Sequence, residues 1–354
     1  MTPVRDFVFA GITTRVVFGR GTLAKARAEV ERLGHSRALV LSTPQQEAQA
    51  RALCSQLGET CAGVFTGAAM HTPVEVTEKA LAAYKESGAS AVVSLGGGST
   101  TGLGKAIAVR TGADQLVIPT TYAGSEMTDI LGETKGGEKT TRRDPAIRPE
   151  TVIYDVDLTL SLPARMTVTS ALNAIAHAVE ALYAPDGNPV IDLMCASALL
   201  SFRDALPVLV DRPGDVDARS RMLYGAWLCS TALGQVSMAL HHKICHTLGG
   251  FGLDHADTHA VMIPHTAGFN GQAVPELLAP VSAAFGGTPG AALHDFARSL
   301  GAPVTLRELG LAESDLDRAA DLATKNPYAN PRPFDRTKIR QLLEDAYNGT
   351  RPKY

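Results

Sequence analysis

The first 158 residues alternate short apolar segments with longer segments of helical spacing. Segments that are apolar along their whole length, such as 91–95, are typical of strands covered on both faces. Strands are expected at 38–41, 63–65, 91–95, 116–118 and 152–154, with 7–9 and 15–18 paired at the start, and helices at 23–33, 44–57 and 73–87. Strands separated by helices in this way predict an α/β domain with a parallel sheet.

The remaining chain contains no convincing strand pattern. Helical spacing recurs instead, with breaks at 213–215 and 286–289, where proline and glycine gather. Helices are expected at 167–182, 189–210, 216–233, 237–248, 290–300, 313–324 and 335–347. The sequence therefore predicts two domains, an α/β domain over 1–158 and an all-helical domain over 159–354.

Composition argues against several classes of protein. The net charge of −3 disfavours nucleic acid as the main partner, because phosphate binding needs a basic surface. No apolar run reaches the roughly 20 residues that span a bilayer, and the N-terminus lacks the pattern of a signal peptide. The five cysteines form no C-x-x-C pair, which favours reduced thiols and a cytoplasmic protein without a membrane partner.

A glycine loop follows one of the predicted strands. The apolar segment 91–95 runs into three consecutive glycines at 96–98 and then Ser99. Backbone N–H groups in such a loop can approach an anion closely, and the next helix adds partial positive charge. A second polar loop, 119–128, follows the next strand, and ligands gather at the carboxyl ends of parallel strands. We expect both loops to line one crevice for a dinucleotide diphosphate; a tight strand–helix turn with capping hydroxyls is the alternative.

The segment 237–265 holds six of the ten histidines in the chain. Histidine is the commonest metal ligand, and its pKa lies near neutrality. His242 and His246 stand four residues apart, and so do Asn173 and His177 in an apolar helical segment, so each pair shares one helix face. A single such histidine is better explained as a buried core residue. The set together predicts a site for a metal, a proton or a substrate.

With these motifs the chain resembles the iron-containing alcohol dehydrogenase superfamily over nearly its whole length. The shared features are GGGS after a strand, PTTYAGSE at 119–126, the spaced pair Asn173 and His177, and H-x3-H-x-L-G-G at 242–250, followed by a further histidine. Within the superfamily it is most similar to maleylacetate reductases, through the stretches GGGSTTGLGKAIAV, PTTYAGSEMTDILGETKGG, LHHKICHTLGG and NPYANPRPF.

The resemblance implies the dehydroquinate synthase-like fold of that superfamily, with 1–158 as the dinucleotide-binding domain and 159–354 as the catalytic domain. It also implies an active site in the cleft between the two domains, and a homodimer. It implies reduction of the carbon–carbon double bond of maleylacetate, or of chloro-substituted maleylacetates, giving 3-oxoadipate in the degradation of aromatic compounds. NADH is the expected reductant, with NADPH as a second candidate. Cofactor contacts are expected at Ser42, Gly96, Gly97, Gly98, Ser99, Thr120, Thr121, Tyr122, Ser125, Thr128 and Leu162.

Two departures from the superfamily concern the metal and the cofactor. Metal-using relatives bind their ion through one Asp and three His, and those positions fall here on Asn173, His177, His242 and His255. The missing carboxylate leaves no anionic protein ligand, so the absence of a metal is expected over iron or zinc, although three histidines can hold zinc. Ser42 stands where relatives often carry an Asp for the adenine ribose, which weakens discrimination against a 2′-phosphate.

Hydride transfer to the double bond of a conjugated ketone places negative charge on the ketone oxygen, which oriented donors stabilise without a metal. The catalytic candidates are Asn173, His177, His242, His246, His255, Lys243, Tyr122 and Tyr328, with Arg332 near the last of these. Together the histidines predict a cationic, hydrogen-bonding pocket for a dicarboxylate. A metal-dependent alcohol or polyol dehydrogenase, a lyase of the dehydroquinate synthase type and a nucleotide-binding regulatory protein are the alternative functions.

Overall fold

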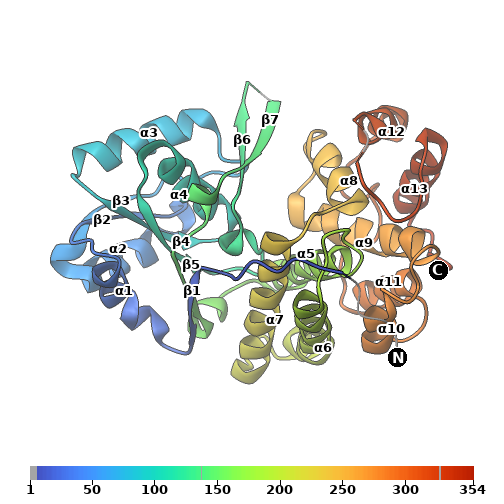
Figure 1. Cartoon of the computed structure of the whole chain (residues 1–354), viewed down its shortest axis with the longest axis horizontal. Coiled ribbons are helices and arrows are strands. Elements are labelled where there is room, and N and C mark those ends of the chain that lie inside the picture. The colour runs from blue at the N-terminus through green and yellow to red at the C-terminus, as the bar shows by residue number, and fades with distance from the viewer. Residues whose placement is uncertain (1–5, 137, 327) are drawn as a thin grey trace. The chain divides into compact units, whose positions relative to one another are not determined.

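The computed structural model describes residues 6–136, 138–326 and 328–354. The chain forms two compact units, Gly11–Leu162 and Pro163–Tyr354, and residues 6–10 group with the second. In Figure 1 the first unit runs from blue to green and the second from yellow-green to red. The first is an α/β unit with a parallel sheet and the second is helical, so the predicted fold class is confirmed.

The first unit ends at Leu162, a few residues beyond the predicted boundary at 158. The reason is the short 3-10 turn Val156–Thr159, which follows the last strand. Val156 and Thr159 are buried, and Leu158 packs against the core cluster of the sheet. This turn therefore completes the α/β core.

The sheet of the α/β unit has six strands in the order β1-β8-β5-β4-β2-β3, all paired in parallel. They are β1 Arg15–Gly19, β2 Ala38–Leu41, β3 Cys61–Phe65, β4 Ala91–Gly96, β5 Asp114–Pro119 and β8 Thr151–Asp155. The helices are α1 Ala26–Arg32, α2 Glu47–Leu57, α3 Val74–Glu86 and α4 Gly98–Thr111. Each strand coincides with a predicted apolar segment, and those predictions are confirmed.

Alternate side chains of β2 pack into two separate apolar layers. Val40 belongs to a cluster that includes Val30 of α1 and Leu53 of α2. Leu39 and Leu41 point the other way, into a cluster with helices α3 and α4. A strand sends successive side chains to opposite faces, so a strand buried on both faces has to be apolar throughout. Burial of each such side chain contributes roughly 1.5–3 kcal/mol relative to its exposure.

The predicted strand at 7–9 is wrong. These residues form no strand, and Val8 is 89% exposed. The segment 15–18, expected to pair with it, lies in β1 and pairs in parallel with β8, starting from Arg15 and Thr151. Two nearby apolar runs suggested a hairpin, but the partner strand lies far along the chain.

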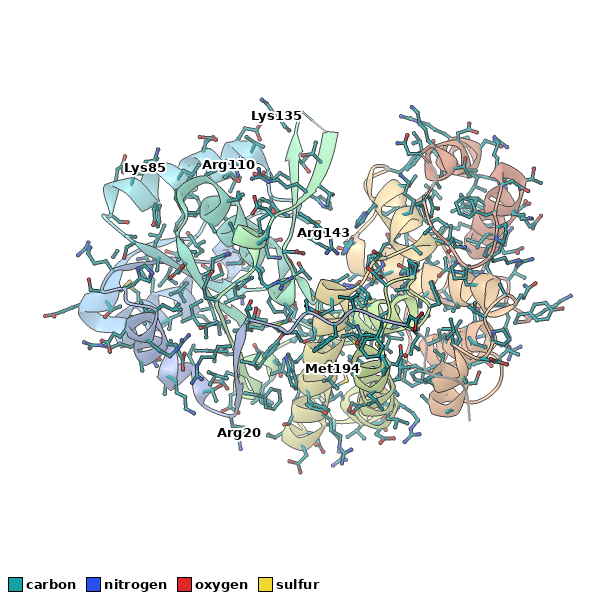
Figure 2. All side chains as sticks on the ribbon, in the orientation of Figure 1. Arg20, Lys85, Arg110, Lys135, Arg143 and Met194 are labelled. Carbon is teal, nitrogen blue, oxygen red and sulfur yellow. A yellow bond between two sulfur atoms is a disulfide. The ribbon has the colours of Figure 1, made fainter. Side chains whose placement is uncertain are left out.

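An antiparallel hairpin, β6 Ile130–Lys135 and β7 Glu138–Arg143, was not predicted. Its sequence is polar and has few of the apolar residues that mark a strand, so its pairing is visible only in the structure. An ion pair of 2.8 Å joins Arg110 of α4 to Glu133 of β6, and Arg143 lies 3.3 Å from Asp129. Arg110 and Arg143 are labelled in Figure 2.

The helical unit contains nine helices among its described residues. They are α5 Ala164–Leu182, α6 Pro189–Asp211, α7 Val216–Gln235, α8 Leu240–Gly249, α9 His255–Gly271, α10 Ala279–Phe285, α11 Pro289–Ser299, α12 Leu316–Thr324 and α13 Arg336–Asn348. Helix α5 packs against α6, α7 and α9, and nearly all of its residues are buried. Helices α9 and α10 were not predicted, and α9 contains Pro264, a residue that usually interrupts helices.

In the described part of the chain, α6 alone is long and apolar enough to cross a membrane by length and composition. Asp192 and Arg203 interrupt its apolar sequence, and its residues Leu199, Phe202 and Leu206 are fully buried. The helix packs against α5, α7 and α10. These contacts are those of a core helix in a folded helical unit.

The prediction of reduced thiols is wrong for two cysteines. Cys54, near the end of α2, and Cys61, at the start of β3, form a disulfide with a Cα–Cα separation of 5.2 Å. Their spacing of seven residues matches no redox or metal motif, and only the fold brings them within bonding distance. Cys195, Cys229 and Cys245 are free and buried, as expected of small core residues.

Candidate functional site

The glycine loop joins β4 to α4 and is shaped by close contacts. A Cβ atom on Gly96 would lie 2.5 Å from Thr100 Oγ1, and one on Gly97 would lie 3.0 Å from Thr121. Gly98 begins α4, and no side chain caps the N-terminus of this helix. Gly98 is exposed. The loop therefore presents an accessible, uncapped helix N-terminus, the kind of site that binds phosphate groups.

The second predicted loop lies beside the glycine loop. The Thr120 N–H donates to Gly96 O at 3.1 Å, and the Gln46 amide donates to Thr120 Oγ1 at 3.1 Å. Both loops leave the carboxyl ends of paired strands, as the sequence predicted. Thr121 is accessible, whereas Tyr122 is completely buried. Tyr122 is therefore placed to shape this loop from inside the α/β unit.

Lys105 of α4 holds this second loop, a contact the sequence interpretation missed. Its ammonium is fully buried and donates to Ser125 O at 2.6 Å, Thr128 Oγ1 at 2.8 Å and Ile130 O at 2.9 Å. Burial lowers the pKa of Lys105 to about 7. Ser125 and Thr128, predicted as cofactor contacts, are thus fixed by a lysine from the helix of the glycine loop.

The remaining predicted cofactor residues lie in the same α/β unit. Ser42 follows β2, is buried, and donates its hydroxyl hydrogen to Thr43 O at 3.1 Å. Ser99 lies in the first turn of α4 and is partly exposed. Leu162 is the last residue of the unit, and its N–H donates to Thr159 O. The strand β2 neighbours β4, so Ser42 lies at the same edge of the sheet as the glycine loop.

The histidines from three helices of the helical unit form one continuous cluster. The ring of His177 on α5 stacks on that of His242 on α8, with centroids 5.1 Å apart. His259 on α9 lies 5.0 Å from His242 and 4.4 Å from His255. His246 lies 6.1 Å from His242 and 6.2 Å from His255. The structure thus brings together all four histidines that the sequence selected, with His259 as an addition.

The cluster extends from the core of the unit to its surface. His177 and His259 are buried and His242 is nearly so, while His255 is partly exposed and His246 is exposed. Asn173, one turn before His177 on α5, is buried as well. A small molecule can therefore approach the cluster from the side of His246 and His255.

Glu180 of α5 is a buried carboxylate in this cluster that the sequence interpretation missed. Its Oε2 lies 2.5 Å from His242 Nδ1, and the carboxylate accepts backbone N–H groups of Ala239, His241 and His242. Burial would raise the pKa of Glu180, but the hydrogen bond and charge of His242 lower it to about 2. A charged residue in the apolar stretch AIAHAVEAL, one turn after His177, was the available signal.

Besides the Glu180–His242 pair, a second series of hydrogen bonds connects Thr266, His241 and His259. His241 Nδ1 lies 3.0 Å from Thr266 Oγ1, and His241 Nε2 lies 2.9 Å from His259 Nδ1. The Thr266 hydroxyl donates to Met262 O in the preceding turn. We therefore assign hydrogens to His241 Nδ1 and His259 Nδ1, which leaves His259 Nε2 with a lone pair.

The predicted cationic character of the pocket is wrong for three of these rings. Burial lowers the pKa of His177 and of His259 well below the usual value, and neighbouring histidines lower both further. Burial also lowers the pKa of His241 to about 3. These rings are therefore neutral near pH 7 and act through hydrogen bonds, because a buried imidazolium without an anion is too costly.

Several polar atoms of the cluster have no hydrogen-bond partner within the described residues, although all are buried. They are Asn173 Oδ1, His177 Nδ1, His242 Nε2 and His259 Nε2. An unpaired buried polar atom costs roughly 1–3 kcal/mol. Four of them on three neighbouring helices indicate a place for a ligand that supplies the missing partners.

Lys243, which follows His242 on α8, lies beside Tyr328. The Lys243 ammonium is 5.9 Å from the centre of the Tyr328 ring, and the Tyr328 hydroxyl is buried without a partner among the described residues. Tyr328 and Arg332 line a cavity of about 500 Å³, but the Arg332 guanidinium bonds Phe269 O and stacks on the Phe269 ring. Arg332 is therefore committed to a structural contact.

The residues at the metal-ligand positions of related dehydrogenases do not fit a divalent ion. Asn173 contributes a neutral amide in place of a carboxylate, and the nearby carboxylate of Glu180 is engaged by His242. Among described residues, the one group of three possible ligands whose atoms lie within 4.8 Å of one another is His241, Cys245 and His259. In that group His241 and His259 already share a hydrogen bond. Within the described residues, the carboxylate of Glu180 is therefore not free to balance an ion at Asn173.

The chain is similar to known proteins over nearly its whole length. Residues 13–156 match the iron-containing alcohol dehydrogenase model, and residues 167–347 match the model of the C-terminal domain of the Fe-containing alcohol dehydrogenase family. The chain is 57% identical over 351 residues to the maleylacetate reductase of Rhizobium sp. strain MTP-10005, covering 99% of this chain and 100% of that relative. It is 51% identical over 348 residues to that of Burkholderia cepacia, covering 98% and 99%.

A solved structure gives the same result for the fold. The crystal structure of maleylacetate reductase from Agrobacterium tumefaciens superposes with a TM-score of 0.96 at 58% sequence identity. The match covers 98% of this chain and 100% of that chain.

Proposed function

Because the chain belongs to the iron-containing alcohol dehydrogenase family, we propose that it reduces the carbon–carbon double bond of maleylacetate to give 3-oxoadipate, with NADH or NADPH as the hydride donor. The observation that carries this proposal is the near-complete alignment at 57% identity to a maleylacetate reductase. The alternative, a metal-dependent alcohol or polyol dehydrogenase, has less support because the carboxylate of the metal site is replaced by Asn173.

The chemistry of the reaction suits the histidine cluster. A bound nicotinamide would supply hydride to the alkene carbon farther from the ketone, which would leave the electron pair of the double bond on the ketone oxygen as an enolate. A proton then adds to the other alkene carbon. The substrate is a dianion, so the site has to supply hydrogen-bond donors to two carboxylates and to the developing oxyanion. Asn173, His177, His242, His246 and His255 are the donors we assign, with Lys243 and Tyr328 of the same unit as further contacts. Tyr122, which is buried in the α/β unit, is assigned to the cofactor loop instead.

We assign the nicotinamide cofactor to the α/β unit. The uncapped N-terminus of α4 and the adjacent loop of Thr120 and Thr121 form the diphosphate site in this proposal. At the end of β2 the chain has Ser42 where a carboxylate would contact the ribose, so the residue at this position does not repel a 2′-phosphate. NADH is the proposed cofactor, and NADPH is accepted as well.

The proposal includes catalysis without a resident metal. The support is chemical: the oxyanion is an enolate, which hydrogen-bond donors stabilise, and the pocket lacks an anionic group free to bind an ion. A homodimer in the cytoplasm and activity on chloro-substituted maleylacetates are also proposed, from the family resemblance alone.

The test is the loss of NADH absorbance with maleylacetate, measured with and without a strong chelator, together with metal analysis of the purified protein. Rapid turnover that the chelator leaves unchanged is expected. Turnover that disappears with the chelator and returns with iron or zinc would show that the metal-free part is wrong. No turnover with maleylacetate, but activity with simple alcohols, would support the alternative dehydrogenase.

A further inference from the structure

We infer that Glu180 is a positioning residue: its carboxylate accepts Nδ1–H of His242 and holds the ring in one orientation, so that Nε2 faces the substrate and donates to it from the protonated ring. This role rests on the proposed function, in which His242 contacts the substrate.

The first support is the contact itself. Glu180 is completely buried, and its Oε2 lies 2.5 Å from Nδ1 of His242, a residue 62 positions along the chain. A carboxylate that carries charge can only accept hydrogen bonds. The same carboxylate accepts the backbone N–H groups of Ala239, His241 and His242, so its oxygens act as acceptors and His242 Nδ1 carries the hydrogen of this contact.

The second support is the ring nitrogen of His242 that does not contact Glu180. With Nδ1 committed, Nε2 is the one remaining polar atom of the His242 ring. It is buried and has no partner within the described residues. Rotation of the ring would break the bond to Glu180 and move Nε2 away from its present place, so the carboxylate sets both the direction and the protonation pattern of the ring.

The third support is that a single helix supplies two of the side chains that contact His242. Helix α5 supplies Glu180 and, one turn earlier, His177, whose ring stacks on that of His242. His242 is therefore held at its edge by a carboxylate and at its face by an imidazole from one rigid, almost wholly buried helix. Sites supported by such buried neighbours keep the orientation that a reaction needs.

Glu180 also has a structural role, and the experiment has to separate this role from the positioning of His242. Its carboxylate accepts backbone N–H groups at the start of α8, where no side chain of the helix itself acts as a cap, and the Tyr183 hydroxyl donates to it at 3.2 Å. Loss of these bonds would destabilise the unit whether or not His242 takes part in the reaction.

The experiment combines a double-mutant cycle with nitrogen NMR of the full-length protein. Glu180→Gln keeps the shape of the side chain but offers an amide, His242→Asn removes the ring, and the third variant carries both changes. We expect Glu180→Gln to lower kcat for maleylacetate by roughly 10- to 100-fold, the usual cost of losing such a supporting partner, with KM for NADH unchanged. In the His242→Asn background, Glu180→Gln should lower kcat little further, because Glu180 can no longer act through the His242 ring.

Tyr183→Phe is the matched control, since it removes one hydrogen bond to Glu180 and leaves the bond to His242. Its kcat should stay within about twofold of the original value. Glu180→Asp retains the charge and should recover part of the activity lost in Glu180→Gln. Nitrogen NMR of ¹⁵N-histidine protein should show a hydrogen on His242 Nδ1 in the original chain and in Glu180→Asp, and a weaker Nδ1–H signal in Glu180→Gln.

Two results would overturn the inference. One is an equal loss of kcat from Glu180→Gln with and without His242. The other is an original chain in which His242 Nδ1 carries no hydrogen, a measurement that needs no folded variant. If the original chain fails to reduce maleylacetate while the nitrogen signals follow Glu180 as expected, the proposed function fails and the positioning of His242 stands.

Discussion

The proposed chemistry can be tested most directly at two residues, His242 and Asn173. One carries an unpartnered ring nitrogen and the other an unpartnered amide oxygen, and both are buried in the same helical unit. The two residues differ in what they provide to a ligand. His242 offers an oriented ring nitrogen to the substrate, and Asn173 offers a neutral oxygen where a metal would need an anion.

Replacement of His242 by Ala should lower turnover of maleylacetate by roughly 10²-fold or more, as removal of one oxyanion donor does. Steady-state kinetics with NADH measures the effect. His35→Ala is the control, since His35 hydrogen-bonds Ser90 and Asp114 in the α/β unit, outside the proposed site. Near-normal turnover in His242→Ala would remove this residue from the catalytic set.

Replacement of Asn173 by Asp should create affinity for zinc or iron, because it restores an anionic oxygen beside His177, His242 and His255. Isothermal titration calorimetry of the purified variant should show uptake of one ion, while the original chain binds much more weakly. The variant Asn173→Asp with His177→Ala should lose this gain. If Asn173→Asp takes up no metal, the account of the pocket given above is wrong.

Helix α4 links the two loops assigned to the cofactor. Its first residue belongs to the glycine loop, and its Lys105 fixes the second loop through three oxygen atoms. One element therefore positions the diphosphate site and the polar residues beside it.

Gly98→Ala should weaken NADH binding without harming the fold. A Cβ atom at Gly98 would meet only Ala123, at 4.0 Å, so the methyl group causes no clash, yet it occupies the exposed start of α4 where the diphosphate is proposed to bind. We expect KM for NADH to rise about tenfold with an unchanged melting temperature. Gly214→Ala, with open space around its Cβ, is the matched control in the helical unit. An unaltered KM in Gly98→Ala would place the diphosphate elsewhere.

Lys105 should make the stability of the chain depend on pH between 7 and 10. Its pKa is about 7 in the folded chain, because of burial, and about 10.4 when unfolded. In that interval the unfolded chain binds the extra proton, so stability rises with pH, by up to about 1.4 kcal/mol per pH unit. The free energy of unfolding of the original chain should therefore rise relative to that of Lys105→Met from pH 7 to pH 9, in urea titrations. Parallel curves would show that Lys105 has an ordinary pKa.

At the scale of the whole molecule, the chain has two compact units with separate apolar cores. The proposed diphosphate site belongs to the α/β unit, and the histidine cluster belongs to the helical unit. A ligand that binds one unit need not order every part of the other.

NADH should therefore protect the two units unequally against hydrogen exchange. Binding at a hundred times the dissociation constant stabilises the bound state by about 2.7 kcal/mol. Peptides covering β4, α4 and the loop after β5 should exchange more slowly with NADH, whereas peptides of α12 and α13 should change little. Equal protection of all peptides would indicate that the two units open together.

Much of this architecture was predictable because it follows from local patterns. Apolar runs marked the six parallel strands, since both faces of such a sheet are buried. Three glycines after β4 marked the loop, since a Cβ at Gly96 or Gly97 would clash with a neighbouring threonine. The four-residue spacing of Asn173 and His177 placed both on one face of α5.

Other features depend on contacts between distant parts of the chain, and only the tertiary structure decided them. Residues 7–9 form no strand, whereas the polar segments β6 and β7 pair as a hairpin. Cys54, near the end of α2, forms a disulfide with Cys61. Helix packing brought Glu180 to His242 and His259 into the histidine cluster.

Burial then made several of those histidines neutral, against the cationic pocket that their number had suggested. The sequence by itself determined the fold class and which residue types gather in the helical unit. Their protonation and orientation were decided by tertiary packing, because both depend on desolvation and on partners many residues away.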